Sequence, residues 1–152
     1  MDTLRVIQAN KNFHRPLIRV SNKGEYFLTN YKKTGQNTEA KQDKVYELGL
    51  NPKIENIQTL IEYTKSENGN HRRLAASALG KLSHMKPEIY HATPALIELL
   101  KDKHPQIRQY SVKALGKIGD KRAIPFLEEI EKNDEKEYNR DSAKNALYGL
   151  KS

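Results

Sequence analysis

Apolar and small residues recur at three- and four-residue steps along much of this chain. In residues 106–119 they include Ile107, Ser111 and Ala114. This spacing is typical of one face of an amphipathic helix, whereas a half-buried strand would alternate apolar and polar residues. A second amphipathic run, residues 93–102, comes shortly before it. The pattern therefore predicts a pair of helices joined by a short turn.

The helix pair occurs three times. Its second helix aligns between units on Leu79, Leu115 and Leu147, at offsets of 36 and 32 residues. A repeat of this length indicates stacked helical units that bury their apolar faces against one another. We therefore predict a mainly α fold, an α-solenoid of about three helix pairs over residues 51–152. The first helices of these pairs are predicted over residues 54–64, 93–102 and 122–132.

Proline, aspartate and arginine stand at related places in two of the units. Pro94 lies near the start of a first helix, Asp102 follows that helix, and Arg108 comes six residues after the aspartate. With these residues the chain resembles the HEAT repeat, in the short form found in phycobilisome-lyase-like proteins, over about residues 52–150. The third unit repeats the order with Pro125, Asp134 and Arg140.

The first unit departs from this order. It has Ser66 where the aspartate would stand, and it lacks the proline, although Arg72 keeps the arginine position. Terminal units of repeat proteins are often atypical, because one of their faces has no neighbouring unit.

One arginine occupies the same position in every unit, six residues before the alanine of the aligned Ala-Leu pair. A row of guanidinium groups at this position could bind phosphates. We favour a structural interpretation, in which an aspartate and the arginine six residues after it bond each other across the turn and also bond the equivalent residues of neighbouring units. These charge-assisted hydrogen bonds would tie successive units together. The residues of this predicted ladder are Arg72, Asp102, Arg108, Asp134 and Arg140.

The polar side of the second helices offers candidate binding residues. In HEAT-like solenoids the second helices line the concave surface, so the resemblance implies that these side chains lie on the inner face. That face would be basic at one end and neutral at the other, and the alternative is a solvated surface without a ligand. Four-residue spacing gives Arg73, Ser77 and Lys81, then Gln109, Lys113 and Lys117, and finally Asn145 beside Asp141 and Gly149.

The first fifty residues show a different pattern. Residues 17–29 alternate around a turn and predict a β-hairpin, with Gly24 in the turn. Over residues 13–30 the sequence also resembles the end of the winged-helix region of RecQ-type helicases. That resemblance would imply a DNA-processing context.

A polar stretch near residues 31–41 predicts a linker, and a short helix is expected to follow it, up to Leu48. We therefore divide the chain into an N-terminal appendage, residues 1–50, and a repeat domain, residues 51–152.

Composition narrows the possible functions. The 152 residues carry a formal net charge of +8, spread over both parts of the chain, and no cysteine. The lack of cysteine excludes disulfides, thiolate metal sites and cysteine nucleophiles. No apolar stretch approaches the ~20 residues of a membrane helix, and the first residues do not form a secretory signal. We therefore expect a soluble, cytoplasmic protein.

No arrangement of residues in the sequence marks catalysis. The five histidines are scattered, none at the four-residue helical spacing of a metal site. We therefore expect no enzyme activity, no metal and no cofactor. The leading hypothesis is a scaffold that binds a partner protein on its concave face.

Nucleic-acid binding is the alternative, in a module of or accessory to a DNA helicase or repair protein, because four of the candidate residues are basic. A third hypothesis is an activity like that of bilin lyases or DNA glycosylases among HEAT-like proteins. Self-association through an uncapped repeat face is left open.

Overall fold

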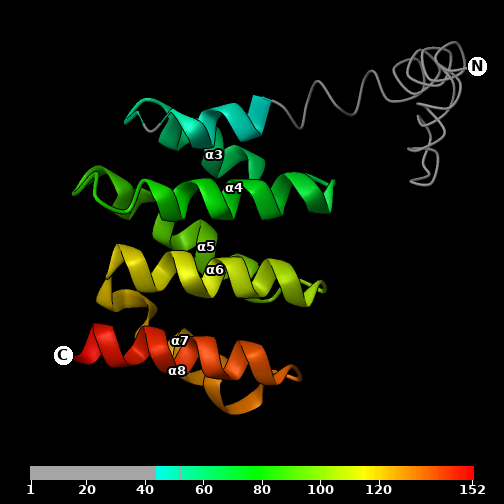
Figure 1. The fold of residues 1–152 in the computed structure, drawn as a ribbon, viewed down its shortest axis with the longest axis vertical. Helices are drawn as coiled ribbons and strands as arrows, with labels where there is room; N and C mark the ends of the chain where they lie inside the picture. The colour runs from blue at the N-terminus through cyan, green and yellow to red at the C-terminus, as the bar shows by residue number, and fades with distance from the viewer. Residues whose placement is uncertain (1–43, 52) are drawn as a thin grey trace, which may run out of the picture. The chain divides into compact units, whose positions relative to one another are not determined.

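The computed structural model describes residues 44–51 and 53–152 (Figure 1). These residues belong to one compact unit, Gln42–Ser152. The predicted hairpin or winged-helix segment, residues 13–30, and the predicted linker near 31–41 lie outside the described residues. All regular elements in the described part of the chain are helices, which confirms the prediction of a mainly α fold there.

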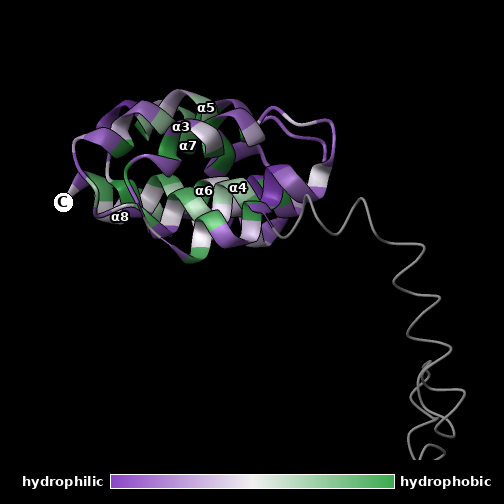
Figure 2. Ribbon diagram, turned by 90° about the horizontal axis from the view of Figure 1, so that it is seen from above, coloured by the Kyte–Doolittle hydropathy of each residue, from purple (hydrophilic) through white to green (hydrophobic). Residues whose placement is uncertain are grey.

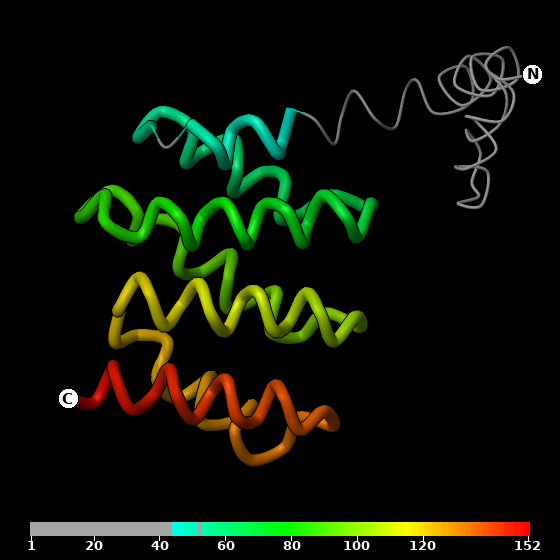
Figure 3. The backbone as a smooth tube through the Cα atoms, viewed as in Figure 1, coloured from blue at the N-terminus to red at the C-terminus, as the bar shows by residue number. Residues whose placement is uncertain are grey.

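The helices alternate between two layers (Figure 2). The first-helix layer contains α3 (Asn56–Tyr63), α5 (Thr93–Leu99) and α7 (Ile124–Asn133). The second-helix layer contains α4 (Gly69–Lys81), α6 (Pro105–Ile118) and α8 (Glu137–Lys151), which lie one above another like rungs (Figure 3). Two short 3-10 helices, η1 (Glu88–Ala92) and η2 (Lys121–Ala123), lead into α5 and α7.

Local residues explain where the second helices begin and end. The side chain of Asn68 caps α4 by accepting a hydrogen bond from the N–H of Asn70 at 2.9 Å. Pro105 opens α6 at a position where its missing N–H costs nothing. Gly119 ends α6 with a φ of 75°, a left-handed conformation that glycine adopts without steric strain.

The core runs without a break from the first described helix to the last. The aligned leucines Leu79, Leu115 and Leu147 are all buried in it. Each helix pair covers the apolar face of the next, so the core is shared between units and does not belong to any one of them.

Successive second helices touch through a glycine on one helix and an alanine on the next. A Cβ atom added to Gly116 would lie 2.9 Å from the Cβ of Ala146, and one added to Gly80 would lie 3.3 Å from the Cα and Cβ of Ala114. Real Cβ atoms do not approach other atoms at the shorter distance, so only glycine allows this spacing without a shift of the helices.

The helix over residues 44–50 makes the same contact one step earlier. A Cβ on Gly49 would lie 2.9 Å from the Cβ of Ala78. Leu48 and Gly49 therefore take the places that Leu79 and Gly80 take in α4. The predicted boundary at residue 50 places this helix in the N-terminal appendage, whereas the compact unit from Gln42 groups it with the repeats.

The glycine position is not repeated in α8. Tyr148 stands there, with 81% of its surface exposed. A phenol ring at this place would keep any further helix from approaching α8 as closely as α6 does.

The two glycines of α6 and α8 give a direct test of this contact. Gly116→Ala should lower the free energy of unfolding by up to about 2 kcal/mol, because overpacking costs about 1–3 kcal/mol and better helix propensity returns about 1 kcal/mol. Gly149→Ala should instead leave stability unchanged or raise it by up to about 1 kcal/mol, because its Cβ would enter open space. Urea unfolding followed by circular dichroism measures both, and a gain in stability for Gly116→Ala would contradict the proposed close contact.

Candidate functional site

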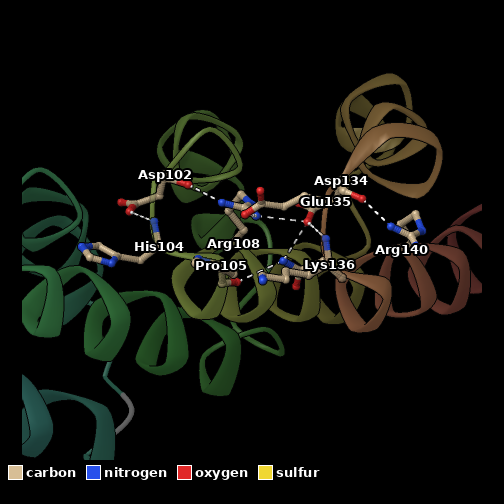
Figure 4. Close-up of polar contacts among 9 residues, drawn as sticks. Asp102, His104, Pro105, Arg108, Asp134, Glu135, Lys136 and Arg140 are labelled. Atoms are coloured by element: carbon tan, nitrogen blue, oxygen red, sulfur yellow. Dashed lines mark hydrogen bonds and ion pairs between the residues drawn. The ribbon is translucent and has the colours of Figure 1, made fainter.

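Arg108 connects two successive turns between helices (Figure 4). Its Nε and Nη2 donate to the two carboxylate oxygens of Asp134 at 2.7 and 3.1 Å, and its Nη1 donates to the backbone carbonyl of Asp102 at 2.8 Å. The guanidinium group therefore bridges the turn of its own unit and the turn of the next. Such two-point pairing with a carboxylate gives both strength and a defined orientation.

Arg72 makes the same contacts one unit earlier. Its Nε and Nη2 donate to the carboxylate of Asp102 at 2.7 and 3.3 Å, and its Nη1 donates to the carbonyl of Ser66 at 2.8 Å. Each arginine thus bonds the backbone, and not the side chain, of the residue six positions before it, so the predicted side-chain pairing of Asp102 with Arg108 within one unit is wrong. The carboxylate partner comes from the following unit.

The aspartates also shape their own turns. Asp134 accepts hydrogen bonds from the N–H of Lys136 at 2.9 Å and from the side-chain amide of Asn139 at 3.3 Å. Asp102 accepts from the N–H of His104 at 3.0 Å, and Ser66 accepts from the N–H of Asn68 at 3.1 Å. Serine therefore keeps the local turn contact in the first unit, without the charge.

The pKa values of both aspartates are lowered. Burial raises the pKa of Asp134, but hydrogen bonds from Arg108, the Lys136 N–H and Asn139 outweigh burial and bring it below the ordinary value. The pKa of Asp102 is lowered in the same way, with burial opposed by the hydrogen bonds from Arg72 and the His104 N–H. The pKa of Arg108 is raised, mainly by its hydrogen bond to Asp134.

Arg140 holds only half of this arrangement. Its Nη1 donates to the carbonyl of Asp134 at 2.6 Å, as the equivalent atoms do in the other units. Within the part of the chain that the structure describes, no carboxylate pairs with it.

These contacts bear on the two interpretations of the arginine row. The carboxylate-facing donors of Arg72 and Arg108 are occupied, and the side chains of these arginines are only 14% and 11% exposed. They are therefore not available to follow a phosphate backbone. The ion pairs join successive units, so Arg72 and Arg108 are structural residues and not candidates for binding a ligand.

The predicted binding residues lie on the solvent side of the second-helix layer, which we call the second-helix face. Arg73, Ser77 and Gln109 are half-buried there. The exposed members are Lys81, Lys113, Lys117 and Asn145.

Arg73 is held in place more firmly than the lysines. Its Nη2 donates to the side-chain oxygen of Asn70 at 2.6 Å, and its guanidinium carbon lies 5.7 Å from the centre of the Tyr110 ring. This distance permits a cation–π attraction between the two helices.

Helices α4 and α6 differ in charge from the first-helix layer and from α8, which carries Glu137 and Asp141. Helices α4 and α6 contain no aspartate or glutamate, and Arg72 and Arg108 are neutralised by their ion pairs. Arg73, Lys81, Lys113 and Lys117 make no ion pair among residues 44–51 and 53–152. The first helices, in contrast, carry exposed or half-buried glutamates at positions 62, 98, 128, 129 and 131.

A groove of about 720 Å³ lies at the N-terminal ends of the second helices. Arg73 and Gln109, both predicted as binding residues, line it together with Tyr138, which is 44% exposed. Tyr138 and Asn70 are not among the predicted binding residues. Asn70 stands three residues before Arg73 and Tyr138 three residues before Asp141, so the i, i+3 spacing of a helix face is the signal that points to them. The remaining lining residues are Gly69, Asn70, His104, Pro105, Gln106 and Ile107.

The described residues show neither a metal-binding cluster nor a membrane-spanning helix. No group of three or more histidine, cysteine, aspartate or glutamate side chains is placed to hold a metal ion there. None of the helices that the structure describes is long and apolar enough to cross a membrane.

Comparison with known families gives one match. The sequence profile of the HEAT repeats matches residues 57–147, which is more than half of the chain, and the chain belongs to this family. HEAT repeats commonly mediate protein–protein scaffolding. The match does not separate subtypes, so the short phycobilisome-lyase-like form stays a prediction. Comparison with curated proteins gives no match.

The ion pair between Arg108 and Asp134 should contribute substantially to stability. Their side chains are only 11% and 2% exposed, so Arg108→Ala leaves a buried carboxylate without its partner and should cost about 3–5 kcal/mol. A double-mutant cycle with Asp134→Ala, measured by urea unfolding, should give a coupling energy of about 2–3 kcal/mol. The exposed pair Lys151 and Glu128 is the control, with an expected coupling below about 1 kcal/mol. Equal coupling in the two pairs would contradict a special role for the buried one.

The lowered pKa of Asp134 predicts a loss of stability in acid. Because its folded pKa lies below the unfolded value of about 3.9, its contribution is fully present above that value and is lost as the pH falls through the folded pKa. The free energy of unfolding should therefore fall less between neutral and acid pH in Asp134→Asn than in the natural protein. Asp141→Asn removes an exposed carboxylate outside the ladder and is the control. The same pH dependence in both variants would refute the assignment.

Proposed function

We propose that this HEAT repeat protein is a non-catalytic scaffold that holds a partner protein on its second-helix face. The observation that carries the proposal is the set of four cations on α4 and α6, with no acidic residue on either helix. An isolated lysine on a surface serves solubility as well as binding. Four cations on two adjacent helices, opposite a layer rich in glutamate, create a directed positive potential.

The shape of this surface supports a macromolecular partner. The candidate residues extend over several stacked helices, and the groove beside Arg73 is wide and open. Extended surfaces built from successive repeats suit polypeptides better than small molecules, which prefer enclosed pockets.

Nucleic-acid binding is the second candidate. It is favoured by the same cations and by Tyr110 and Tyr138, whose rings could stack on unpaired bases. We rank it second because the positive charge does not continue onto α8, where Asp141, Asn145 and Gly149 occupy the corresponding positions. A nucleic-acid backbone would be better served by cations along the whole face.

Site-specific photocrosslinking tests the proposal. A benzophenone amino acid at Ser77, on the second-helix face, should crosslink a distinct protein in cells that produce this chain. The same group at Gln58, exposed on α3, should not. Reversing charge with Lys113→Glu and Lys117→Glu should abolish the adduct, because an acidic partner would then be repelled.

The matched control reverses the same charge on the other layer. Lys101, just after α5, and Lys132, on α7, are both exposed, and Lys101→Glu with Lys132→Glu should leave the adduct intact. Loss of the adduct in both double variants would show a nonspecific charge effect and refute the proposal. An adduct sensitive to nuclease would move nucleic-acid binding to first place.

A further inference from the structure

We propose that the segment bound on the second-helix face is acidic and carries an apolar anchor side chain, which lies over the helix of residues 44–50. This inference rests on the proposed function and specifies the chemistry of the partner. It is carried by the alignment of that helix with α4, α6 and α8, by its exposed apolar residues and by the cations beside them.

The glycine contact fixes the alignment. Because Gly49 meets Ala78 as Gly80 meets Ala114, the first described helix presents its side chains in the same register as α4. Tyr46 then corresponds to Ser77, and Leu50 corresponds to Lys81. Both residues therefore belong to the second-helix face and extend it by one helix.

This added helix is apolar where its neighbours are basic. Tyr46 and Leu50 are 51% and 52% exposed, and Ile54, in the turn that follows, is 51% exposed. Three of the six exposed large apolar residues in the described part of the chain thus lie close together in sequence, and one of them, Leu50, begins the row that contains Lys81. An apolar patch bordered by polar residues is a common mark of a protein-binding surface.

Two rows of side chains run across the stack. One row consists of Leu50, Lys81 and Lys117, and the other contains Tyr46, Ser77 and Lys113. Each row begins with an apolar residue; the first continues into Lys81 and Lys117, and the second reaches Lys113 after the neutral Ser77. A partner that follows the row of Leu50, Lys81 and Lys117 would meet an apolar contact first and positive charge next.

The helix spacing limits the conformation of such a partner. Helices in contact lie roughly 8–10 Å apart, and the glycine contacts keep these at the lower end of that range. A polyproline II segment advances roughly 9 Å in three residues and returns to the same face. An extended segment with an apolar residue, and with acidic residues three and six positions away, would therefore match the row of Leu50, Lys81 and Lys117.

The apolar patch distinguishes this partner from a nucleic acid. A phosphate backbone would satisfy Lys81 and Lys117 but would offer nothing to Leu50. An acidic peptide with a leucine or phenylalanine can contact Leu50 with that side chain and pair its carboxylates with Lys81 and Lys117. Burial of such a side chain supplies the affinity that exposed charge pairs alone do not.

Synthetic peptides provide the test. Fluorescein-labelled twelve-residue peptides would contain one leucine and glutamates three and six residues from it, in a proline- and serine-rich background and in both chain directions. Fluorescence anisotropy against the full chain should show saturable, salt-sensitive binding for one direction. Changing the peptide leucine to serine should weaken binding about tenfold, and changing the glutamates to glutamine should abolish it.

Variants of the protein locate the contact. Leu50→Ser should weaken binding of the leucine peptide about tenfold but leave binding of the serine peptide unchanged, because the lost contact is already absent there. Lys81→Glu with Lys117→Glu should abolish binding of both peptides. Phe126→Ser, which removes an exposed apolar residue of the first-helix layer, is the control and should change neither. Circular dichroism checks that each variant is folded.

Three results of the binding measurements would overturn the inference, and so would the absence of any peptide binding. The first is equal affinity for the glutamate and glutamine peptides. The second is that Leu50→Ser lowers the affinity for the leucine peptide and for the serine peptide by the same factor. The third is that an oligothymidine of the same charge binds more tightly than the leucine peptide. A protein adduct at Ser77 without any peptide binding would refute the acidic, apolar chemistry alone and leave the scaffold function standing. Peptide binding without a cellular adduct would refute the scaffold proposal alone.

Discussion

Direct contact between glycine and alanine on successive second helices is the constraint on which the described structure depends. At three steps along the stack, a glycine backbone lies where no Cβ could be added without meeting the alanine of the next helix or crowding it. This closeness brings each interhelical turn within reach of the arginine of the preceding unit. The pairing of Arg72 with Asp102, and of Arg108 with Asp134, follows from that spacing.

Ion pairing in turn decides which charges face solvent. Helices α4 and α6 each bear two adjacent polar or cationic residues near their start, and the first of the two, Arg72 or Arg108, is paired with an aspartate of the next unit. Arg72 is neutralised by a carboxylate, whereas Arg73, its neighbour in sequence, turns to the other side and contacts Asn70 and Tyr110. One residue of helical rotation thus separates a structural arginine from a candidate binding arginine. Arg72 therefore joins two units, whereas Arg73 lies on the second-helix face, where a partner can reach it.

Sequence patterns anticipated the repeat units well, and the reasons are local. Three- and four-residue spacing marked the helices, and the aligned leucines marked the shared core. The helix of residues 44–50 was assigned differently because Glu47 stands where the other units have alanine, so the Leu-Gly pair was not recognised as part of the repeat. The apolar end of the second-helix face, Tyr46 and Leu50, was missed for the same reason. Tyr148 was also missed, since its importance depends on the glycine contact that it interrupts.

The sequence alone determined the helical character of the units, their period and the residues that could form a ladder, because all of these depend on spacing within about forty residues of chain. Only the tertiary structure decided which acceptor each arginine takes. Arg72 and Arg108 pair with the carboxylates of aspartates 30 and 26 residues away. They bond the residue six positions before them through its backbone carbonyl and not through its side chain. Distance in sequence could not rank these acceptors, since the choice is made by how closely neighbouring units pack. That packing distance rests on contacts between residues of different helices, which no local pattern specifies.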